Sequence, residues 1–196
     1  MITNEYVEGA TPLDPDELAG LKYKHITTRE QLDELEQANI VTGLLWLKKN
    51  ITRDDVLTNN FAMDLHKALF KDVWTWAGTF RLTEKNIGID PFGISVALRN
   101  LLDDLSAWIE YKSYPPVEAV LRFHHQLVKI HPFPNGNGRF SRIYADTVAE
   151  KYFAASPIKW GGRNLDKITQ TRTDYINALK TADAGDISVL LKLYDE

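Results

Sequence analysis

Apolar residues recur every three or four positions along most of this chain, which is the spacing of one buried face of an α-helix. Thr28 stands before the first such stretch and can cap it, and Thr52 and Asp55 resemble a cap for the second. The pattern therefore predicts a mainly α-helical fold. The expected helices cover approximately residues 29–49, 54–70, 93–112, 116–130, 139–153, 165–182 and 186–193.

One short segment, residues 79–90, has the alternation of a strand instead. Phe80 and Leu82 alternate with polar residues before a polar turn, and Ile87 alternates with Ile89 after it. This alternation predicts a short β-hairpin. Because an isolated hairpin is only marginally stable in water, an irregular surface loop is the alternative.

Length, charge and composition fit one domain over residues 1–196, with residues 1–26 as an extended arm because they contain two prolines. The net charge is −4, so no basic field attracts nucleic acid or an anionic membrane, and neither is expected as a partner. Cysteine is absent, which excludes disulfides and thiol catalysis. No apolar run approaches the ~18 residues of a membrane span, and residues 1–9 do not resemble a signal peptide. We therefore expect a cytoplasmic protein.

The segment 131–142, which reads HPFPNGNGRFSR, carries the clearest chemical signal. Its glycines allow positive φ angles or close approach to a ligand, and glycines that open a helix present backbone N–H groups to an anion. Arg139 and Arg142 are three residues apart and project from the same first turn. The pattern predicts a phosphate site, with the imidazole of His131 beside it as a proton acceptor whose unperturbed pKa is about 6.5.

Other residues with chemical potential have structural interpretations. His124 falls on the apolar stripe of helix 116–130 and is expected in the core, while His125 lies toward the polar side. No ligand spacing typical of zinc is present, so a zinc site is not expected. Glu36 falls on an apolar helix face, so we expect a partly buried carboxylate bound by a core arginine or by backbone donors, with a regulatory role as the alternative. Three tryptophans are also expected in the core, with a nucleotide pocket as the alternative: Trp74, Trp76 and Trp108.

The segment 131–142 resembles the signature of Fic-domain proteins, His-Pro-Phe-x-Asp/Glu-Gly-Asn-Gly-Arg-x-x-Arg. Every fixed position matches except Asn135, where the family usually has an acid. Trp76-Ala77-Gly78 followed by Arg81 resembles the family's lead-in to its target-binding flap. The resemblance implies the Fic fold, a compact helical bundle with a short β-hairpin flap beside the active-site loop. Two further segments are similar to the branch called mobile mystery protein B: Gly9–Leu13 and Glu36–Asn39.

The resemblance implies an enzyme that transfers AMP from ATP to a Ser, Thr or Tyr hydroxyl of a target protein, with Mg²⁺ as cofactor. His131 would take the proton of the attacking hydroxyl, Phe133 would anchor the loop, and the flap would hold the target by strand pairing. The implied phosphate-binding residues are Gly136, Asn137, Gly138, Arg139 and Arg142, and the implied flap residues are Arg81, Leu82, Thr83, Ile87, Gly88 and Ile89.

Asn135 changes the metal prediction. The acid that the family usually has at this position binds magnesium, and an asparagine offers only a neutral carbonyl, so we expect weaker metal binding here. This leaves two alternatives to AMP transfer. One is transfer of another phosphate-containing group, such as UMP, phosphocholine or a phosphoryl group. The other is a non-catalytic nucleotide-binding module.

Inhibition is the remaining question, because an unrestrained transferase of this kind can act as a toxin. Many Fic proteins are inhibited by a helix that reads Ser/Thr-x-x-x-Glu-Gly/Asn. The nearest approach here, Thr3 with Glu8-Gly9, is one residue too long. Two explanations stay open: a separate inhibitory, antitoxin-like partner, and low activity caused by Asn135.

Overall fold

The computed structural model describes residues 12–52, 55–161 and 169–194. Within these ranges the chain forms helices and no strand, so the prediction of a mainly α fold is confirmed. Residues 1–11, which include Thr3 and Glu8, lie outside the described part. The elements are α1 (Pro15–Leu18), α2 (Arg29–Asn50), α3 (Asn59–Phe70), the 3-10 helix η1 (Pro91–Gly93), α4 (Ile94–Tyr111), α5 (Pro116–Ile130), α6 (Asn137–Phe153), α7 (Gln170–Asp183) and α8 (Ser188–Tyr194).

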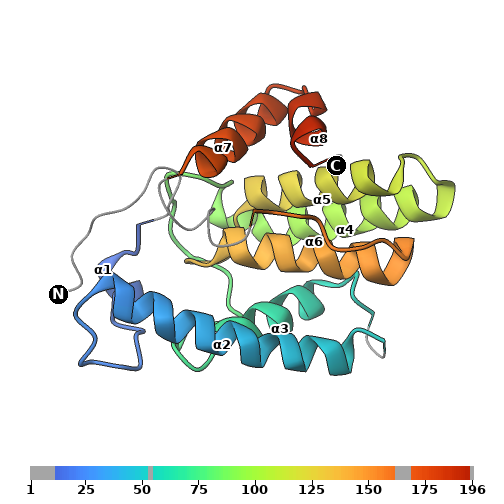
Figure 1. Ribbon diagram of the computed structural model, residues 1–196. Helices are drawn as coiled ribbons and strands as arrows, with labels where there is room; N and C mark the ends of the chain where they lie inside the picture. Colours follow the sequence, from blue (N-terminus) through green and yellow to red (C-terminus); the bar gives the residue numbers. More distant parts are fainter. Residues whose placement is uncertain (1–11, 53–54, 162–168, 195–196) are drawn as a thin grey trace.

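The longer helices form three layers (Figure 1). α2 and α3 pack together on one side, α4, α5 and α6 form the middle, and α7 with α8 covers the opposite side. α5 and α6 are consecutive in the chain and pack against each other, so the loop that joins them, residues 131–136, is held between two helices. This loop is the first half of the glycine-rich segment singled out from the sequence.

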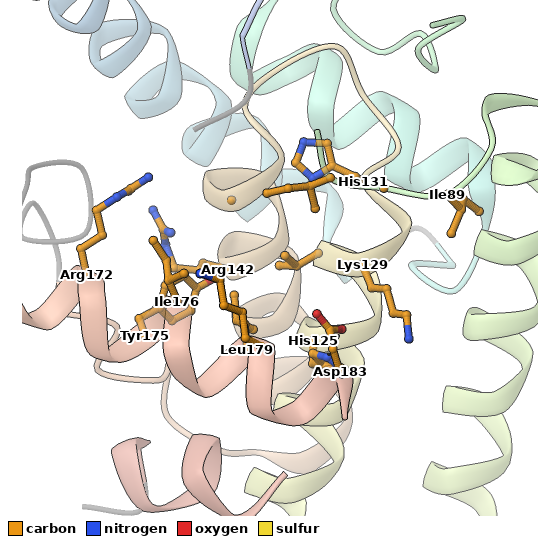
Figure 2. A pocket seen from close by; sticks show the side chains of 15 residues that line it. Ile89, His125, Lys129, His131, Arg142, Arg172, Tyr175, Ile176, Leu179 and Asp183 are labelled. Atoms are coloured by element: carbon orange, nitrogen blue, oxygen red, sulfur yellow. Dashed lines mark hydrogen bonds and ion pairs between the residues drawn. The ribbon is translucent and has the colours of Figure 1, made fainter. Parts of the chain in front are cut away.

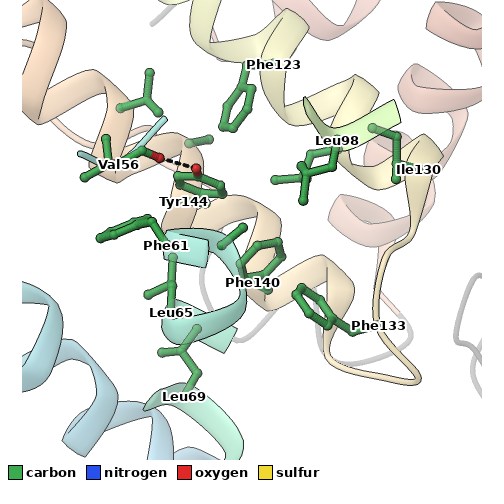
Figure 3. Packing of buried hydrophobic residues seen from close by; sticks show 14 of the residues in the cluster. Val56, Phe61, Leu65, Leu69, Leu98, Phe123, Ile130, Phe133, Phe140 and Tyr144 are labelled. Carbon is green, nitrogen blue, oxygen red and sulfur yellow. Dashed lines mark hydrogen bonds between the residues drawn. The ribbon is translucent and has the colours of Figure 1, made fainter. Parts of the chain in front are cut away.

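Aromatic residues of α3, α5 and α6 fix the middle layer (Figure 3). The rings of Phe123 and Tyr144 meet edge to face with centroids 5.1 Å apart, and Phe61 lies 5.7 Å from Tyr144. The buried Tyr144 hydroxyl donates to the Val56 carbonyl, which satisfies the one polar atom of that ring. Because these rings leave little freedom between α3, α5 and α6, they also fix where the loop before α6 begins.

The start of α3 differs from its prediction. The helix begins at Asn59 rather than at Asp54, because Thr58 and not Thr52 is its N-cap: the Thr58 hydroxyl accepts a backbone N–H of the first turn at 3.1 Å. Asp55 caps a preceding turn instead, where its Oδ1 accepts a backbone N–H at 2.9 Å. A short turn therefore separates α2 from α3.

The other described helices begin and end within two residues of their predicted bounds, except at the start of α7. α7 begins at Gln170, capped by Thr169, and the start predicted at residue 165 lies outside the described residues. The arm predicted over residues 1–26 contains one helical turn, α1, in its described part. Asp14 and Glu17 stabilise this turn as a reciprocal cap, which the sequence analysis overlooked.

The predicted hairpin over residues 79–90, hereafter the flap segment, is wrong: this segment is an irregular loop without strands. Its two halves are joined by a side chain rather than by a backbone ladder. The Arg81 guanidinium donates to the Thr83 carbonyl at 2.8 Å and also to the Ile89 carbonyl. An arginine between the two halves occupies carbonyls that strand pairing would use, so the alternation of apolar residues does not produce a hairpin here.

Candidate active site

The loop between α5 and α6 turns through two left-handed residues. His131 is the C-cap of α5 with φ of 54°, and Gly136 precedes α6 with φ of 76°. A β-carbon at Gly136 would lie 2.6 Å from the Phe70 ring, so both its conformation and its surroundings require glycine. The two turns bring the His131 side chain to the same cavity as Gly138 in the first turn of α6.

Two side chains inside this segment fix its shape. Phe133 is fully buried and stacks on His66 with ring centroids 3.7 Å apart. The Phe133 N–H donates to Asn137 Oδ1 at 2.9 Å, and Asn137 Nδ2 donates to the Phe133 carbonyl at 2.7 Å. The Asn137 side chain therefore braces the loop, and its backbone N–H is one of the first N–H groups of α6, at the end of a helix where anions bind.

His66 of α3 supports the loop, and the sequence analysis missed it. Its Nδ1 accepts the Gly78 N–H at 3.0 Å, and its Nε2 lies 3.1 Å from the Asn135 carbonyl oxygen. Burial lowers the pKa of His66 to about 3, so the ring is neutral and can accept at Nδ1 while it donates from Nε2. No motif or spacing marks this residue, because only the folded chain brings α3 to the loop.

A cavity of about 370 Å³ opens beside the loop, between the flap segment, α5, α6 and α7 (Figure 2). His131, Gly138 and Arg142 line it, so the predicted base, one motif glycine and one motif arginine share a single space. Apolar side chains from the flap segment and α7 form much of the remaining wall. Such a cavity, apolar with a few convergent polar groups, has the character of a small-molecule site.

Cationic side chains dominate the charge of the cavity even though the net charge of the chain is −4. Figure 2 shows Arg142 and Arg172 toward one end, and His125 with Asp183 toward another. Asp183 is the one carboxylate among the described residues that line the cavity, and it pairs with His125 at 2.9 Å. The arginine end therefore attracts an anion. The other cations in the lining are Lys129 and Lys180.

The electrostatics of His131 differ from those of a free imidazole. The side chain is only 5% exposed, and burial lowers its pKa to about 4, with a further lowering by Arg81 and Lys85. A hydrogen bond to the Val128 backbone acts in the opposite direction, as expected when a ring N–H donates to a carbonyl. The pKa of His131 therefore lies well below the 6.5 of an unperturbed imidazole. The ring is neutral at pH 7, and its second nitrogen carries the lone pair of a proton acceptor.

The two motif arginines point in different directions. Arg142 lines the cavity and hydrogen-bonds with Tyr175. Arg139 instead pairs with α2, where its Nη2 lies 2.7 Å from Glu36 Oε2. Glu36 is 2% exposed, and its Oε1 accepts the Trp74 indole N–H at 2.7 Å. The expectation that a core arginine binds this carboxylate is confirmed, and the arginine comes from the motif itself.

Asn135 offers little to a metal ion. Its Oδ1, a neutral oxygen, accepts the Gly136 N–H at 2.7 Å within the loop. The part of the chain that the structure describes holds no group of three or more His, Cys, Asp or Glu side chains suited to a metal. Asn135 could give a Mg²⁺ ion one neutral oxygen, and the other ligands would then be nucleotide phosphates and water.

The flap segment has a buried part and an exposed part. Arg81, expected to contact a target, is only 1% exposed, and its Nε donates to the His131 carbonyl at 2.7 Å. Leu82 and Thr83 are exposed, and their contact with a target stays a prediction. The residues of the flap segment that line the cavity are Ile87, Gly88 and Ile89.

α7 supplies cavity residues that the sequence analysis did not identify. Arg172, Ile176, Leu179 and Lys180 follow one helical face, and all four line the cavity. The spacing of these residues is visible in the sequence. It does not reveal which other helix that face meets, so the residues could not be assigned to the site before the fold was known.

The histidines on α5 were partly predicted. His124 is fully buried, with Nε2 2.9 Å from the Tyr175 hydroxyl, which confirms its place in the core. His125 was expected on the polar side, but it is only 5% exposed. That prediction failed because α7 covers this face of α5 and brings Asp183 to the ring.

The three tryptophans do not line the cavity. Trp74 is 1% exposed and stacks on Trp76 with centroids 4.8 Å apart. Trp108 packs edge to face on Tyr114 at 5.4 Å. The core interpretation is confirmed for Trp74, whereas Trp108 lines a second cavity beside His125 and Lys129.

The fold is a helical bundle in which the α5–α6 loop places a neutral imidazole at a cavity beside the first turn of α6. Residues 56–149, which contain both the loop and the flap segment, match the sequence model of the Fic/DOC family. These residues of the chain are therefore a Fic domain. The narrower similarity to the mobile mystery protein B branch stays a prediction.

Curated relatives carry the same domain within longer chains. A protein named protein adenylyltransferase Fic from Aedes aegypti is 26% identical over 83% of this chain and 33% of its own length. A relative of the same name from Drosophila grimshawi is 31% identical over 75% of this chain and 28% of its own length. The chain thus spans about a third of the curated relatives that it matches.

Solved Fic structures share the fold at low sequence identity. Fic-1 from C. elegans superposes with a TM-score of 0.64 at 19% identity, over 89% of this chain and 50% of that chain. BepC, a VirB-translocated effector of Bartonella tribocorum solved with bound AMPPNP, gives a TM-score of 0.62 at 20% identity, over 92% of this chain and 96% of that one. No helix among the described residues is both long enough and apolar enough to cross a membrane.

Proposed function

We propose that this protein is an adenylyltransferase that transfers AMP from ATP to a Ser, Thr or Tyr hydroxyl of a target protein. The observation that carries the proposal is the arrangement of one cavity: a neutral His131 and the arginine end both meet at the first turn of α6. The names of the curated relatives and the AMPPNP bound to BepC support the same donor. The acceptor protein is part of the proposal and enters from the side of the flap segment.

The proposed chemistry assigns each group one task. The His131 ring takes the proton as the acceptor O–H bond breaks, and the oxygen forms a bond to the α-phosphorus of ATP. The bond between that phosphorus and the oxygen bridging to the β-phosphate breaks, and pyrophosphate leaves. Backbone N–H groups at the N-terminus of α6 and the Arg142 guanidinium stabilise the charge on the phosphates. The apolar wall from Ile89 and Ile176 is suited to the nucleoside.

Labelled donors test this function directly. The protein is incubated with cell extract and magnesium, using ATP labelled on either the α- or the γ-phosphate. AMP transfer places the α label on protein and leaves the γ label in pyrophosphate. Label from γ-labelled ATP, or from UTP or CDP-choline, would identify one of the alternative transfer reactions. Tight ATP binding without any label would point to a nucleotide-binding module.

Arg172 is predicted to bind the terminal phosphates of the donor, because it lines the arginine end of the cavity with Arg142. Arg172→Gln should weaken ATP binding by about tenfold, which is the scale of one charge-assisted contact. AMP, which lacks the terminal phosphates, should bind the variant and the wild type equally. Calorimetry with both nucleotides checks this, with Arg99→Gln on the exposed side of α4 as control. Equal losses for ATP and AMP would contradict the assignment.

Asn135→Asp is predicted to increase the dependence of nucleotide binding on metal. A carboxylate at this position adds the charge that a Mg²⁺ ion prefers. ATP affinity of the wild type should change little when EDTA replaces magnesium, whereas the variant should bind about tenfold more tightly with magnesium than without it. Titrations of both proteins with ATP at several magnesium concentrations measure this, and transfer activity should rise in parallel. A variant that shows the metal response of the wild type would remove Asn135 from the metal position.

A further inference from the structure

Arg81 carries a buried charge that is bound by backbone carbonyls. Its side chain is 1% exposed, among the largest fully buried side chains of the described residues. Nε donates to the His131 carbonyl at 2.7 Å, and Nη2 reaches the Ile130 carbonyl at 3.4 Å and also the Ile89 carbonyl. The Arg81 backbone N–H donates to the Pro132 carbonyl at 2.9 Å. One residue therefore holds three consecutive carbonyls, those of residues 130, 131 and 132.

The position of these carbonyls explains why a cation is stable there. α5 ends at Ile130, and the last carbonyls of a helix lack intrahelical donors and carry the negative end of the helix dipole. A guanidinium satisfies several of them at once, because its five N–H donors lie in one plane. Burial lowers the pKa of Arg81, and the nearby carboxylates of Asp90, Glu17 and Glu84 act against this lowering. The charge is thus balanced by carbonyl dipoles together with carboxylates at longer range.

The conformation of His131 needs this support. Its φ of 54° is in the left-handed region, which costs a residue with a β-carbon of the order of 1 kcal/mol and persists where the surroundings impose it. Arg81 binds the carbonyl of His131 itself and those of both neighbours. These bonds fix the peptide planes on either side of the His131 Cα, and so fix the direction in which the imidazole leaves the backbone.

Gly88 shows how closely the flap segment approaches these two residues. A β-carbon there would lie 2.5 Å from Arg81 Nη2 and 2.9 Å from His131 Cβ, and φ of Gly88 is +119°. The flap segment therefore closes over Arg81 and His131 together, and no side chain fits between them.

We propose that Arg81 is a positioning residue for catalysis: its buried guanidinium holds the left-handed turn at the end of α5 and thereby aims the His131 imidazole into the cavity. The catalytic consequence rests on the proposed function. The orientation of the His131 ring by Arg81 does not depend on which donor binds. Arg81 does not line the cavity.

Two substitutions separate geometry from charge. Arg81→Lys keeps the positive charge but lacks the planar set of donors, and Arg81→Met removes both. The matched control is Arg122→Met. Arg122 is a half-buried arginine of α5, the helix that also contains Val128, whose backbone contacts His131. For each protein we would measure the melting temperature, the Kd for ATP, the rate of label transfer from α-labelled ATP, and the ¹⁵N signals of the His131 ring.

Both Arg81 variants should bind ATP within about threefold of the wild type and transfer label about 100-fold more slowly, the cost expected of a base misplaced by about 1 Å. The ¹⁵N signals of the His131 ring, assigned with a His131→Gln sample, should shift or broaden in Arg81→Lys and stay unchanged in Arg122→Met. If Arg81→Met does not fold, Arg81→Lys carries the test.

The results distinguish a failure of the positioning role of Arg81 from a failure of the proposed function. Arg81→Lys that transfers label at the wild-type rate overturns the positioning role, and so does a loss of ATP affinity that parallels the loss of rate, since that marks a purely structural residue. If the wild type transfers no label, the proposed function fails. The ¹⁵N signals of the His131 ring then test the positioning role of Arg81 alone. Unchanged ¹⁵N signals in Arg81→Lys then overturn the proposal, and shifted signals support it.

Discussion

Replacing His131 with alanine should lower the rate of AMP transfer by about 10³-fold, within the range that general base catalysis contributes. In the proposed reaction the imidazole is the proton acceptor, and the left-handed turn and the Val128 hydrogen bond hold it in the cavity. ATP binding should stay within about threefold of the wild type, because the phosphates are held by α6 and the arginine end instead. The measurement is the initial rate of label transfer, together with an ATP titration of each protein.

His25→Ala is the matched control, because His25 is an exposed histidine outside the cavity. It should transfer label at the wild-type rate. A His131→Ala protein that is folded, binds ATP and still transfers label as fast as the wild type would remove His131 from the mechanism.

The pH dependence follows from the sign of the shift. The base must be neutral to act, and the pKa of His131 is lowered to about 4, so activity is present above that pH and is lost as pH falls through it. From about pH 6 to 8, kcat/KM should not change because of this group. Bound ATP brings negative charge beside the ring and raises its pKa, so the acid limb of kcat should lie at higher pH than that of kcat/KM.

Unfolding must be separated from titration of the active site in that experiment. His66 and His124 have pKa values lowered to about 3, and that of His131 is about 4, all below the 6.5 of an unperturbed histidine. Below pH 6.5 the unfolded chain therefore binds protons that the native chain does not, and the free energy of unfolding falls as pH drops. Rates at low pH count only where circular dichroism shows a folded protein.

The sequence revealed the helices and the loop because both depend on local signals. Apolar spacing predicted the bounds of α5, and Gly136 in the loop is required by a left-handed turn and a close approach to Phe70. The hairpin was predicted wrongly because alternation of apolar residues does not encode where a neighbouring guanidinium goes. The sequence marks Arg81 only as a residue of the flap, because its guanidinium binds a carbonyl 50 residues away in the chain.

The residues of the site were also predicted only where they are close together in the sequence. His131, Gly138 and Arg142 were found from one segment, since twelve consecutive residues contain them. Arg172 and Ile176 were missed because α7 meets the cavity only through tertiary packing. Arg139 lies in the motif, and its assignment to phosphate stays a prediction, but the buried carboxylate of Glu36 determines its direction in this structure. Local patterns identify the groups, and distant partners decide where those groups point.

The buried ion pair of Arg139 and Glu36 is expected to stabilise the fold. Replacing Arg139 with methionine should lower the free energy of unfolding by about 3–5 kcal/mol, the cost of leaving a buried charge without its partner. Glu36 is 2% exposed and would keep only the Trp74 N–H as a donor among the contacts described above. For a domain of this size the melting temperature should fall by roughly 6–20 °C. Thermal and urea unfolding measure both quantities.

Arg99→Met provides the contrast, because Arg99 pairs with Asp103 on the exposed surface, where side chains are 45% and 59% exposed. That substitution should cost less than about 1 kcal/mol. The double variant Glu36→Leu/Arg139→Met removes both charges, so it should recover most of the lost stability. Its ATP affinity then isolates any contact of Arg139 with the donor: wild-type affinity means that the guanidinium serves α2, and a tenfold loss means that it also reaches phosphate. An Arg139→Met protein that melts within about 2 °C of the wild type, less than a 1 kcal/mol change would produce, contradicts the buried pair.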